Sequence, residues 1–172
     1  MKVQLGKLRE GVNELIIESA LSEMGLGVDE NTLRLFPNKI NARVEIQKLS
    51  DKYFVRTSVN TLAHFTCDRC LEDYDRELEN TFQLYFTNKS GEDETSRDDF
   101  RFLAANTDEI DLAEDVVENL QLTLPMKNIC KSNCKGLCPN CGANLNINQC
   151  NCRAEKVDPR WEELRKLTSN KE

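Results

Sequence analysis

The sequence of 172 residues predicts an α+β fold in which an antiparallel β-meander is covered by a helix and followed by a small cysteine-rich module. Three observations predict this fold. Apolar and polar residues alternate in three segments between residues 40 and 86, as in half-buried strands. Residues 111–124 carry an apolar stripe at helical spacing. Six of the eight cysteines lie within residues 130–152.

The first forty residues carry weaker patterns. Val3 and Leu5 alternate with polar neighbours, and residues 15–17 form a short apolar run, so both segments predict strands. Residues 20–26 predict a helical turn that ends at Gly25 and Gly27.

Three long strands follow. Their apolar positions are Ile40, Ala42, Val44 and Ile46; Tyr53, Val55, Val59, Ala63 and Phe65; and Leu78, Phe82, Leu84 and Phe86. A turn at residues 50–52 joins the first two strands, and residues 67–70 join the second to the third, which predicts an antiparallel meander. The acidic, apolar-free residues 88–99 predict a solvated loop.

The covering helix is predicted after this loop. Asp111 is expected to cap its first N–H groups, Glu114 to reach back, and Pro125 to end it. The stripe that would lie on the sheet is Leu112, Val116, Val117, Leu120 and Leu124. A last helix is predicted to begin at Asp158 and Pro159, with Trp161 favoured as a docking anchor over a base-stacking platform.

The cysteine spacings indicate metal binding. Residues 138–142 read C-P-N-C-G, in which two thiolates can share one metal and the glycine lets the backbone turn back toward them. We expect two zinc ions, one held by Cys138, Cys141, Cys150 and Cys152 and the other by Cys67, Cys70, Cys130 and Cys134. Such closed four-cysteine sites leave no position for water, so they are interpreted as structural staples. The module has almost no apolar residues, and zinc would supply its folding free energy.

The sequence has no apolar segment of signal-peptide or membrane-span length. We therefore expect a cytoplasmic protein without a membrane partner, in which this many cysteines favour metal over disulfides. The C-D-R-C pair at a hairpin tip also differs from a thioredoxin-like redox motif, which needs a βαβ setting.

No catalytic pattern is found in the sequence. His64 is the only histidine and falls on the polar face of its strand, so no nucleophile has a base and carboxylate to draw on. The seven glycines are scattered and form no phosphate-binding loop. We expect no enzymatic activity and no small-molecule substrate.

The net charge of −7 is unevenly distributed. Residues 1–124 carry 14 basic and 25 acidic side chains, whereas residues 125–172 carry 9 basic and 5 acidic ones. Two interpretations of the basic tail stay open. Its cations can neutralise thiolates bound to zinc, or they can form a surface that meets phosphate.

Four sequence segments resemble one family. They are C-D-R-C-L at 67–71, C-K-G-L-C-P-N-C-G-A-N-L-N at 134–146, C-N-C at 150–152 and D-P-R-W at 158–161. In their order and separation they resemble the YceD family, named for large ribosomal RNA subunit accumulation. The resemblance implies a cytoplasmic bacterial protein, also found in plastids, that is needed for normal levels of 23S ribosomal RNA.

We therefore expect a non-enzymatic factor in large-subunit ribosome biogenesis that binds ribosomal RNA precursor or an assembly protein. Residues 1–125 would form the body, and residues 126–172 a zinc-ribbon-like module with a terminal helix. The candidates for phosphate contact are Arg69, Lys131, Lys135, Arg153, Arg160, Arg165 and Lys166. Two other classes stay open: a redox-switched zinc protein whose thiolates oxidise and release metal, and a pure protein-interaction adaptor.

Overall fold

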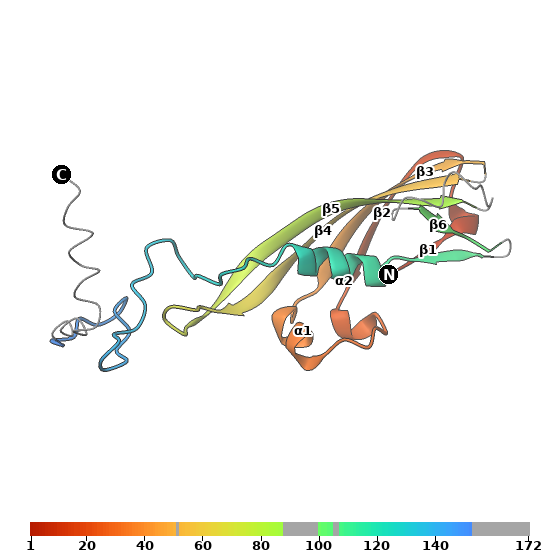
Figure 1. Cartoon of the computed structure of the whole chain (residues 1–172). Helices are drawn as coiled ribbons and strands as arrows, with labels where there is room; N and C mark the ends of the chain where they lie inside the picture. Colours follow the sequence, from red (N-terminus) through yellow and green to blue (C-terminus); the bar gives the residue numbers. More distant parts are fainter. Residues whose placement is uncertain (51, 88–99, 105–106, 153–172) are drawn as a thin grey trace, which may run out of the picture.

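A five-stranded sheet forms the main layer of the protein, whose computed structural model describes residues 1–50, 52–87, 100–104 and 107–152 (Figure 1). Four of its strands are antiparallel neighbours: β2 (Gly11–Ser19), β3 (Ile40–Leu49), β4 (Lys52–Thr66) and β5 (Asp73–Thr87). The short β6 (Phe100–Phe102) pairs in parallel with β5, so the sheet is mixed. A separate antiparallel ribbon joins β1 (Lys2–Gln4) to β7 (Glu109–Asp111).

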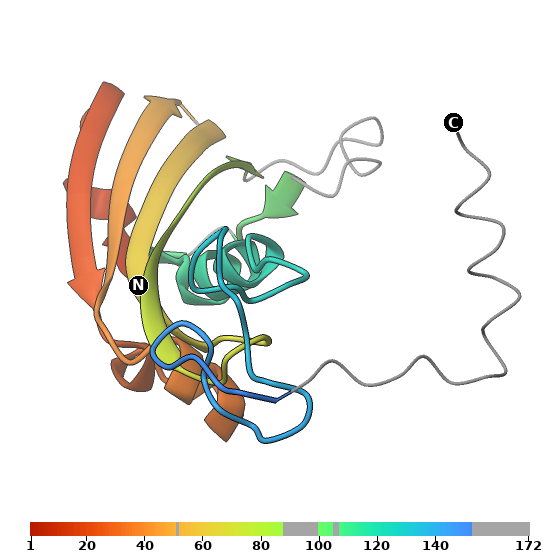
Figure 2. The same cartoon turned by 90° about the vertical axis from the view of Figure 1, so that its left-hand side faces the viewer.

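Short helical segments connect and cover these strands. The described residues contain two 3-10 helices, η1 (Leu5–Lys7) and η2 (Leu21–Glu23), and two α-helices, α1 (Glu30–Leu35) and α2 (Ala113–Leu122). The sheet is curved, and α2 lies on its concave side (Figure 2). No helix in the described part of the chain is both long and apolar enough to cross a membrane.

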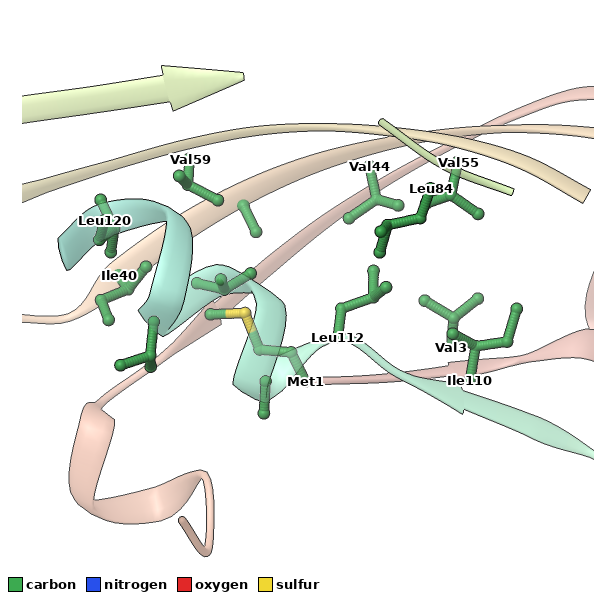
Figure 3. Close-up of a cluster of buried hydrophobic side chains, with 14 of the residues drawn as sticks. Met1, Val3, Ile40, Val44, Val55, Val59, Leu84, Ile110, Leu112 and Leu120 are labelled. Atoms are coloured by element: carbon green, nitrogen blue, oxygen red, sulfur yellow. The ribbon is translucent and has the colours of Figure 1, made fainter. Parts of the chain in front are cut away.

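The core lies between the concave face of the sheet and α2. The alternating residues Ile40, Ala42, Val44 and Ile46 of β3 are at most 1% exposed, as their pattern predicts. Figure 3 shows Leu112 and Leu120 directed toward the sheet side chains, and all of them belong to one buried cluster. Burial of each such aliphatic side chain stabilises the fold by about 1.5–3 kcal/mol, so the sheet has a core that does not depend on the cysteines.

The predicted meander is confirmed, and the structure extends it. The strand predicted near residues 15–17 is β2, which joins the same sheet, and the predicted turn after it is η2. The helix α1 was not predicted, because six residues are too short for a periodic signal. Its start is marked by Asp29, whose side chain accepts from the Thr32 N–H at 3.3 Å. The loop predicted at residues 88–99 and the helix predicted from Asp158 lie outside the described residues.

The predicted cap of α2 is wrong in detail. Leu112 occupies the N-cap position without a side-chain hydrogen bond, and Asp111 lies one residue earlier. From there its carboxylate accepts from the Ala113 N–H at 3.0 Å and from the Met1 amino group at 2.9 Å. Asp111 therefore helps both to begin α2 and to hold β1 against β7, instead of forming a capping box with Glu114.

Candidate metal centres

The first candidate centre joins the tip of the β4–β5 hairpin to the segment after α2. Cys67 and Cys70 come from the hairpin, and Cys130 and Cys134 from the tail, which extends along the hairpin in Figure 1. The four sulfurs lie within 4.8 Å of one another. Those of Cys67 and Cys134 are 3.9 Å apart, and those of Cys70 and Cys130 are 3.7 Å apart. All but Cys130 are buried.

The hairpin tip is a tight turn that directs both of its sulfurs to one side. The Leu71 N–H donates to the Cys67 carbonyl at 2.9 Å, and the Cys67 N–H donates to the Glu72 carbonyl at 2.9 Å. Leu71 has a φ of 56°, in the left-handed region that a residue with a side chain seldom adopts. The turn is thus held closed by its backbone before any metal is considered.

Backbone pairing docks the tail on this turn. The Asp68 N–H donates to the Asn128 carbonyl at 2.7 Å, and the Asn128 N–H donates to the Asp68 carboxylate at 2.7 Å. Two residues after Cys134, Gly136 passes close to Arg69: a Cβ at Gly136 would lie 3.0 Å from the Arg69 carbonyl oxygen. That oxygen accepts from the Leu137 N–H at 2.9 Å. The two chain segments therefore meet at fixed positions on both sides of the four sulfurs.

Hydrogen-bond donors around the first centre favour thiolates. Burial opposes ionisation of Cys67, but N–H groups of Cys130, Cys70 and Arg69 outweigh it and lower the pKa of Cys67 to about 6. The Asn146 amide donates to the Cys134 sulfur at 3.3 Å and, against the effect of burial, lowers its pKa. Burial and the neighbouring thiols raise the pKa of Cys130 to about 12. A metal ion bound at this cluster would hold all four cysteines as thiolates.

The second candidate centre lies within the tail and consists of Cys138, Cys141, Cys150 and Cys152, whose sulfurs also fall within 4.8 Å of one another. The Gly142 N–H donates to the Cys138 carbonyl at 2.9 Å, and Gly142 has a φ of 73°. This is the conformation for which glycine is suited. N–H groups of Cys141 and Asn140 lower the pKa of Cys138 to about 6. Cys141 and Cys152 are exposed, so this centre is the more open to solvent.

The geometry fits a tetrahedral metal ion. A zinc–sulfur bond of about 2.3 Å separates the sulfurs of a regular tetrahedron by about 3.8 Å. The two separations given above for the first centre match that value, whereas a disulfide would require about 2.05 Å. None of the eight cysteines forms a disulfide. A set of four sulfurs offers a soft site, suited to zinc or iron and poorly suited to magnesium or calcium.

Comparison with known proteins connects these centres to a family. The sequence profile described as "Large ribosomal RNA subunit accumulation protein YceD" matches residues 55–168, which is well over half of the chain and includes every cysteine. The chain belongs to the YceD family. The match begins in β4, so it covers the hairpin and the tail that together form the first centre.

Two relatives show how far the likeness extends. An uncharacterized protein of Mycobacterium tuberculosis is 30% identical over 123 residues, which cover 70% of this chain and 58% of that protein. The chloroplastic YCED homolog 1 of Arabidopsis thaliana is 26% identical over 185 aligned positions, gaps included, and the match covers 91% of this chain and 56% of the homolog. The matches thus span little more than half the length of these relatives. No solved structure is significantly similar to the chain.

The residues predicted to contact phosphate fall into three groups. Lys131 and Lys135 are exposed, and neither forms an ion pair with another described residue. The Arg69 guanidinium donates to the Cys134 carbonyl at 3.1 Å, so this side chain also holds the first centre together. Arg153, Arg160, Arg165 and Lys166 lie outside the described residues.

The sequence analysis did not predict several residues that support the first centre. Asn146 donates to the Cys134 sulfur and accepts from the Lys135 N–H at 2.9 Å, so it links the two ends of the loop between the centres. Asp68 and Asn128 were also missed, because no short-range pattern connects residues sixty positions apart. His64 lies apart from the sulfurs: its Nδ1 is 2.7 Å from an Asp75 carboxylate oxygen, on the exposed face of β4.

Proposed function

We propose that this chain is a non-enzymatic factor that supports the accumulation of large-subunit ribosomal RNA. The observation that carries the proposal is the YceD profile match over residues 55–168, which contains both cysteine clusters. The description of that family names ribosomal RNA accumulation and no catalytic activity. The chloroplastic relatives of Arabidopsis thaliana and Zea mays carry the same description in their names, which further supports the proposal.

Zinc is the proposed occupant of both centres, and both are proposed to be structural. Four thiolates at tetrahedral spacing complete the coordination of the ion and leave no position for a reactive water. In this proposal residues 1–125 are the body and residues 126–172 are a module that zinc folds and attaches to it. Cys130 and Cys134 would bind the ion that attaches the module, because their centre includes the hairpin tip.

The module is also the proposed contact for ribosomal RNA precursor in the cytoplasm. It carries a net charge of +4, against −11 for residues 1–124, so the body repels a polyanion and the module attracts it. Lys131 and Lys135 are exposed beside the first centre, where a bound zinc would fix their spacing. With three to five usable cations, the log–log dependence of RNA affinity on salt should have a slope of about −2 to −4.

A complementation experiment tests the proposal in cells that lack this protein. Wild-type chain should restore the ratio of large- to small-subunit ribosomal RNA. Lys131→Glu with Lys135→Glu should fail to restore it while keeping its zinc, and the control Arg43→Glu, an exposed change on the sheet, should restore it. The double variant should also flatten the salt slope of binding to precursor RNA fragments by about 1.4.

The outcomes distinguish the alternatives. Normal ribosomal RNA in cells without the protein would overturn the proposed function. Restoration by the double variant would instead overturn only the RNA-contact step, and would favour an adaptor that binds a protein. A chain that releases its zinc at low oxidant and then gains holdase activity would favour the redox-switched class.

A further inference from the structure

Two sulfur–sulfur contacts in the first centre cross from the hairpin to the tail. The Cys70 and Cys130 sulfurs are 3.7 Å apart, and those of Cys67 and Cys134 are 3.9 Å apart. Each contact joins chain positions at least 60 residues apart. A disulfide formed across such a contact would tie the body to the tail. A disulfide formed within the hairpin or within the tail would leave the two segments unconnected.

Hydrogen bonds that do not involve sulfur hold Cys70 beside Cys130. Asp68 lies two residues before Cys70, and Asn128 lies two residues before Cys130. These two residues pair through two hydrogen bonds of 2.7 Å each. A disulfide bond is about 2.05 Å long, so the two sulfurs would have to approach by less than about 2 Å. The docked backbone therefore brings this pair close to bonding distance.

The cysteines of the first centre differ in their exposure. A bound metal would hold all four as thiolates, so exposure decides which of them an oxidant reaches first. Cys130 is the only one of the four that is not buried. Its neighbour in the chain, Lys131, is exposed. An oxidant would therefore meet the Cys130 sulfur before the others.

Hydrogen bonds to the other sulfurs favour Cys70 as the partner of Cys130. The Cys67 sulfur accepts from the Cys130 N–H at 3.4 Å, and the Cys134 sulfur accepts from the Asn146 amide at 3.3 Å. A disulfide from Cys130 to either of these sulfurs would draw that sulfur away from its donor. Cys70 and Cys130 can join while both hydrogen bonds are kept.

The reaction with hydrogen peroxide balances in two steps. The Cys130 thiolate attacks one peroxide oxygen: an S–O bond forms, the O–O bond breaks, and hydroxide leaves, which gives a sulfenic acid. The Cys70 thiolate then attacks that sulfur: an S–S bond forms, the S–O bond breaks, and a second hydroxide leaves. Two thiolates thus lose two electrons, and one peroxide is reduced to two hydroxide ions.

We propose that peroxide converts the first centre into a Cys70–Cys130 disulfide, which keeps the tail attached to the hairpin after the metal leaves. A covalent bond would replace the metal between the same two segments. The second centre has no such bridge, because all four of its cysteines lie in the tail. Such a disulfide goes beyond the proposed function: it rests on the zinc occupancy proposed above and needs no RNA.

Peptide mapping of the full chain tests this pairing. The zinc-loaded protein would be treated with hydrogen peroxide, alkylated, and digested with trypsin without reduction. Trypsin cleaves after lysine and arginine, so each cysteine of the first centre lies on its own peptide: 57–69, 70–76, 128–131 and 132–135. The expected main product links residues 70–76 to residues 128–131.

Other products would overturn the proposal. Linkage within the hairpin, of 57–69 to 70–76, or within the tail, of 128–131 to 132–135, would leave the two segments unconnected. Zinc content is measured before oxidation, so that the two proposals are distinguished. A chain isolated without zinc would overturn the zinc occupancy and this proposal with it, whereas a zinc-loaded chain that forms other disulfides would overturn this proposal alone.

Two double variants test whether the disulfide holds the tail. Cys67→Ser with Cys134→Ser keeps the expected pair, and the control, Cys67→Ser with Cys130→Ser, keeps only one member of it. The Asp68 amide donates to the tail, so its hydrogen exchange reports on docking. Peroxide should slow this exchange at least about tenfold in the first variant and leave it unchanged in the control. Equal effects of peroxide in both variants would overturn the proposal.

Discussion

At the residue scale, the first candidate centre depends on backbone conformations that only particular residues accept. Gly136 has a φ of 73°, and its α-carbon passes so close to Arg69 that a side chain would meet the carbonyl oxygen. Gly142 has the same φ but open space around it. The two glycines therefore separate the conformational effect of a side chain from its steric effect.

Gly136→Ala should weaken the docking of the tail on the hairpin. The left-handed φ alone destabilises a non-glycine residue by about 1 kcal/mol, and the contact with the Arg69 carbonyl adds to that. We expect a loss of roughly 2–3 kcal/mol for Gly136→Ala and about 1 kcal/mol for Gly142→Ala. Chelator competition on the zinc-loaded protein would measure this loss as a decrease in zinc affinity in each variant. Equal zinc affinities in the two variants would mean that the close approach to Arg69 has no energetic consequence.

The residues that hold the centres were only partly predictable. The eight cysteines stand out because their type and spacing carry the signal. Asn146 and Asp68 do not, because an Asn or Asp that bonds a sulfur or a distant backbone resembles any Asn or Asp in a turn. Only the folded chain shows which of them contacts Cys134 or Asn128.

At the scale of elements, the strands were predictable where one face is fully buried. β3 and β4 alternate over ten and fifteen residues because one face of each strand is buried in the core along most of its length. β6 is three residues long and α1 is six, so neither repeats often enough to show a period. The parallel pairing of β6 also depends on the path of the chain, which local pattern does not encode.

One buried carboxylate connects β6 to α2. Asp115 of α2 is 2% exposed, and Arg101 of β6 donates to it through both terminal nitrogens, at 3.0 Å for Nη1. Burial raises the pKa of Asp115, and Arg101 opposes that effect. Because the pKa is higher in the folded state, the ionised carboxylate destabilises the fold increasingly as the pH rises from the unfolded pKa of about 3.9 to the folded pKa. This destabilisation is absent only below the unfolded pKa.

Arg101→Met should leave this charge unpaired. The variant should lose roughly 2–3 kcal/mol at neutral pH, below the range for fully buried pairs because the Arg101 side chain is 42% exposed. Because burial raises the pKa of Asp115, the loss should shrink as the pH falls toward the unfolded value of about 3.9, since a protonated Asp115 needs no partner. Urea unfolding of wild type and variant at several pH values would measure it. Arg101→Met with Asp115→Asn should recover most of the stability, and a pH-independent loss would show that the charge is not the cause.

At the scale of the whole molecule, the two candidate centres differ in what they connect. The first joins the hairpin tip to the tail, and the second closes a loop within the tail. The sheet has its own core, whereas the described tail residues include no large core cluster of their own. Loss of the second centre should therefore stay local, and loss of the first should be felt by the sheet through β4 and β5.

Metal removal should proceed in two steps. We expect freshly purified protein to hold about two zinc ions per chain, because each centre offers four thiolates. Chelator or peroxide should release the ion of Cys138, Cys141, Cys150 and Cys152 first, since Cys141 and Cys152 are exposed and the first centre is mostly buried.

The variant Cys141→Ser should keep about one zinc per chain and an unchanged melting temperature of the sheet. Cys70→Ser should lower that temperature by roughly 4–8 °C, for a loss of about 2 kcal/mol. Metal analysis measures the zinc content of each variant, and thermal unfolding monitored by circular dichroism measures its melting temperature. Equal shifts in the two variants, or release of both ions in one step, would contradict a first centre that joins body and tail.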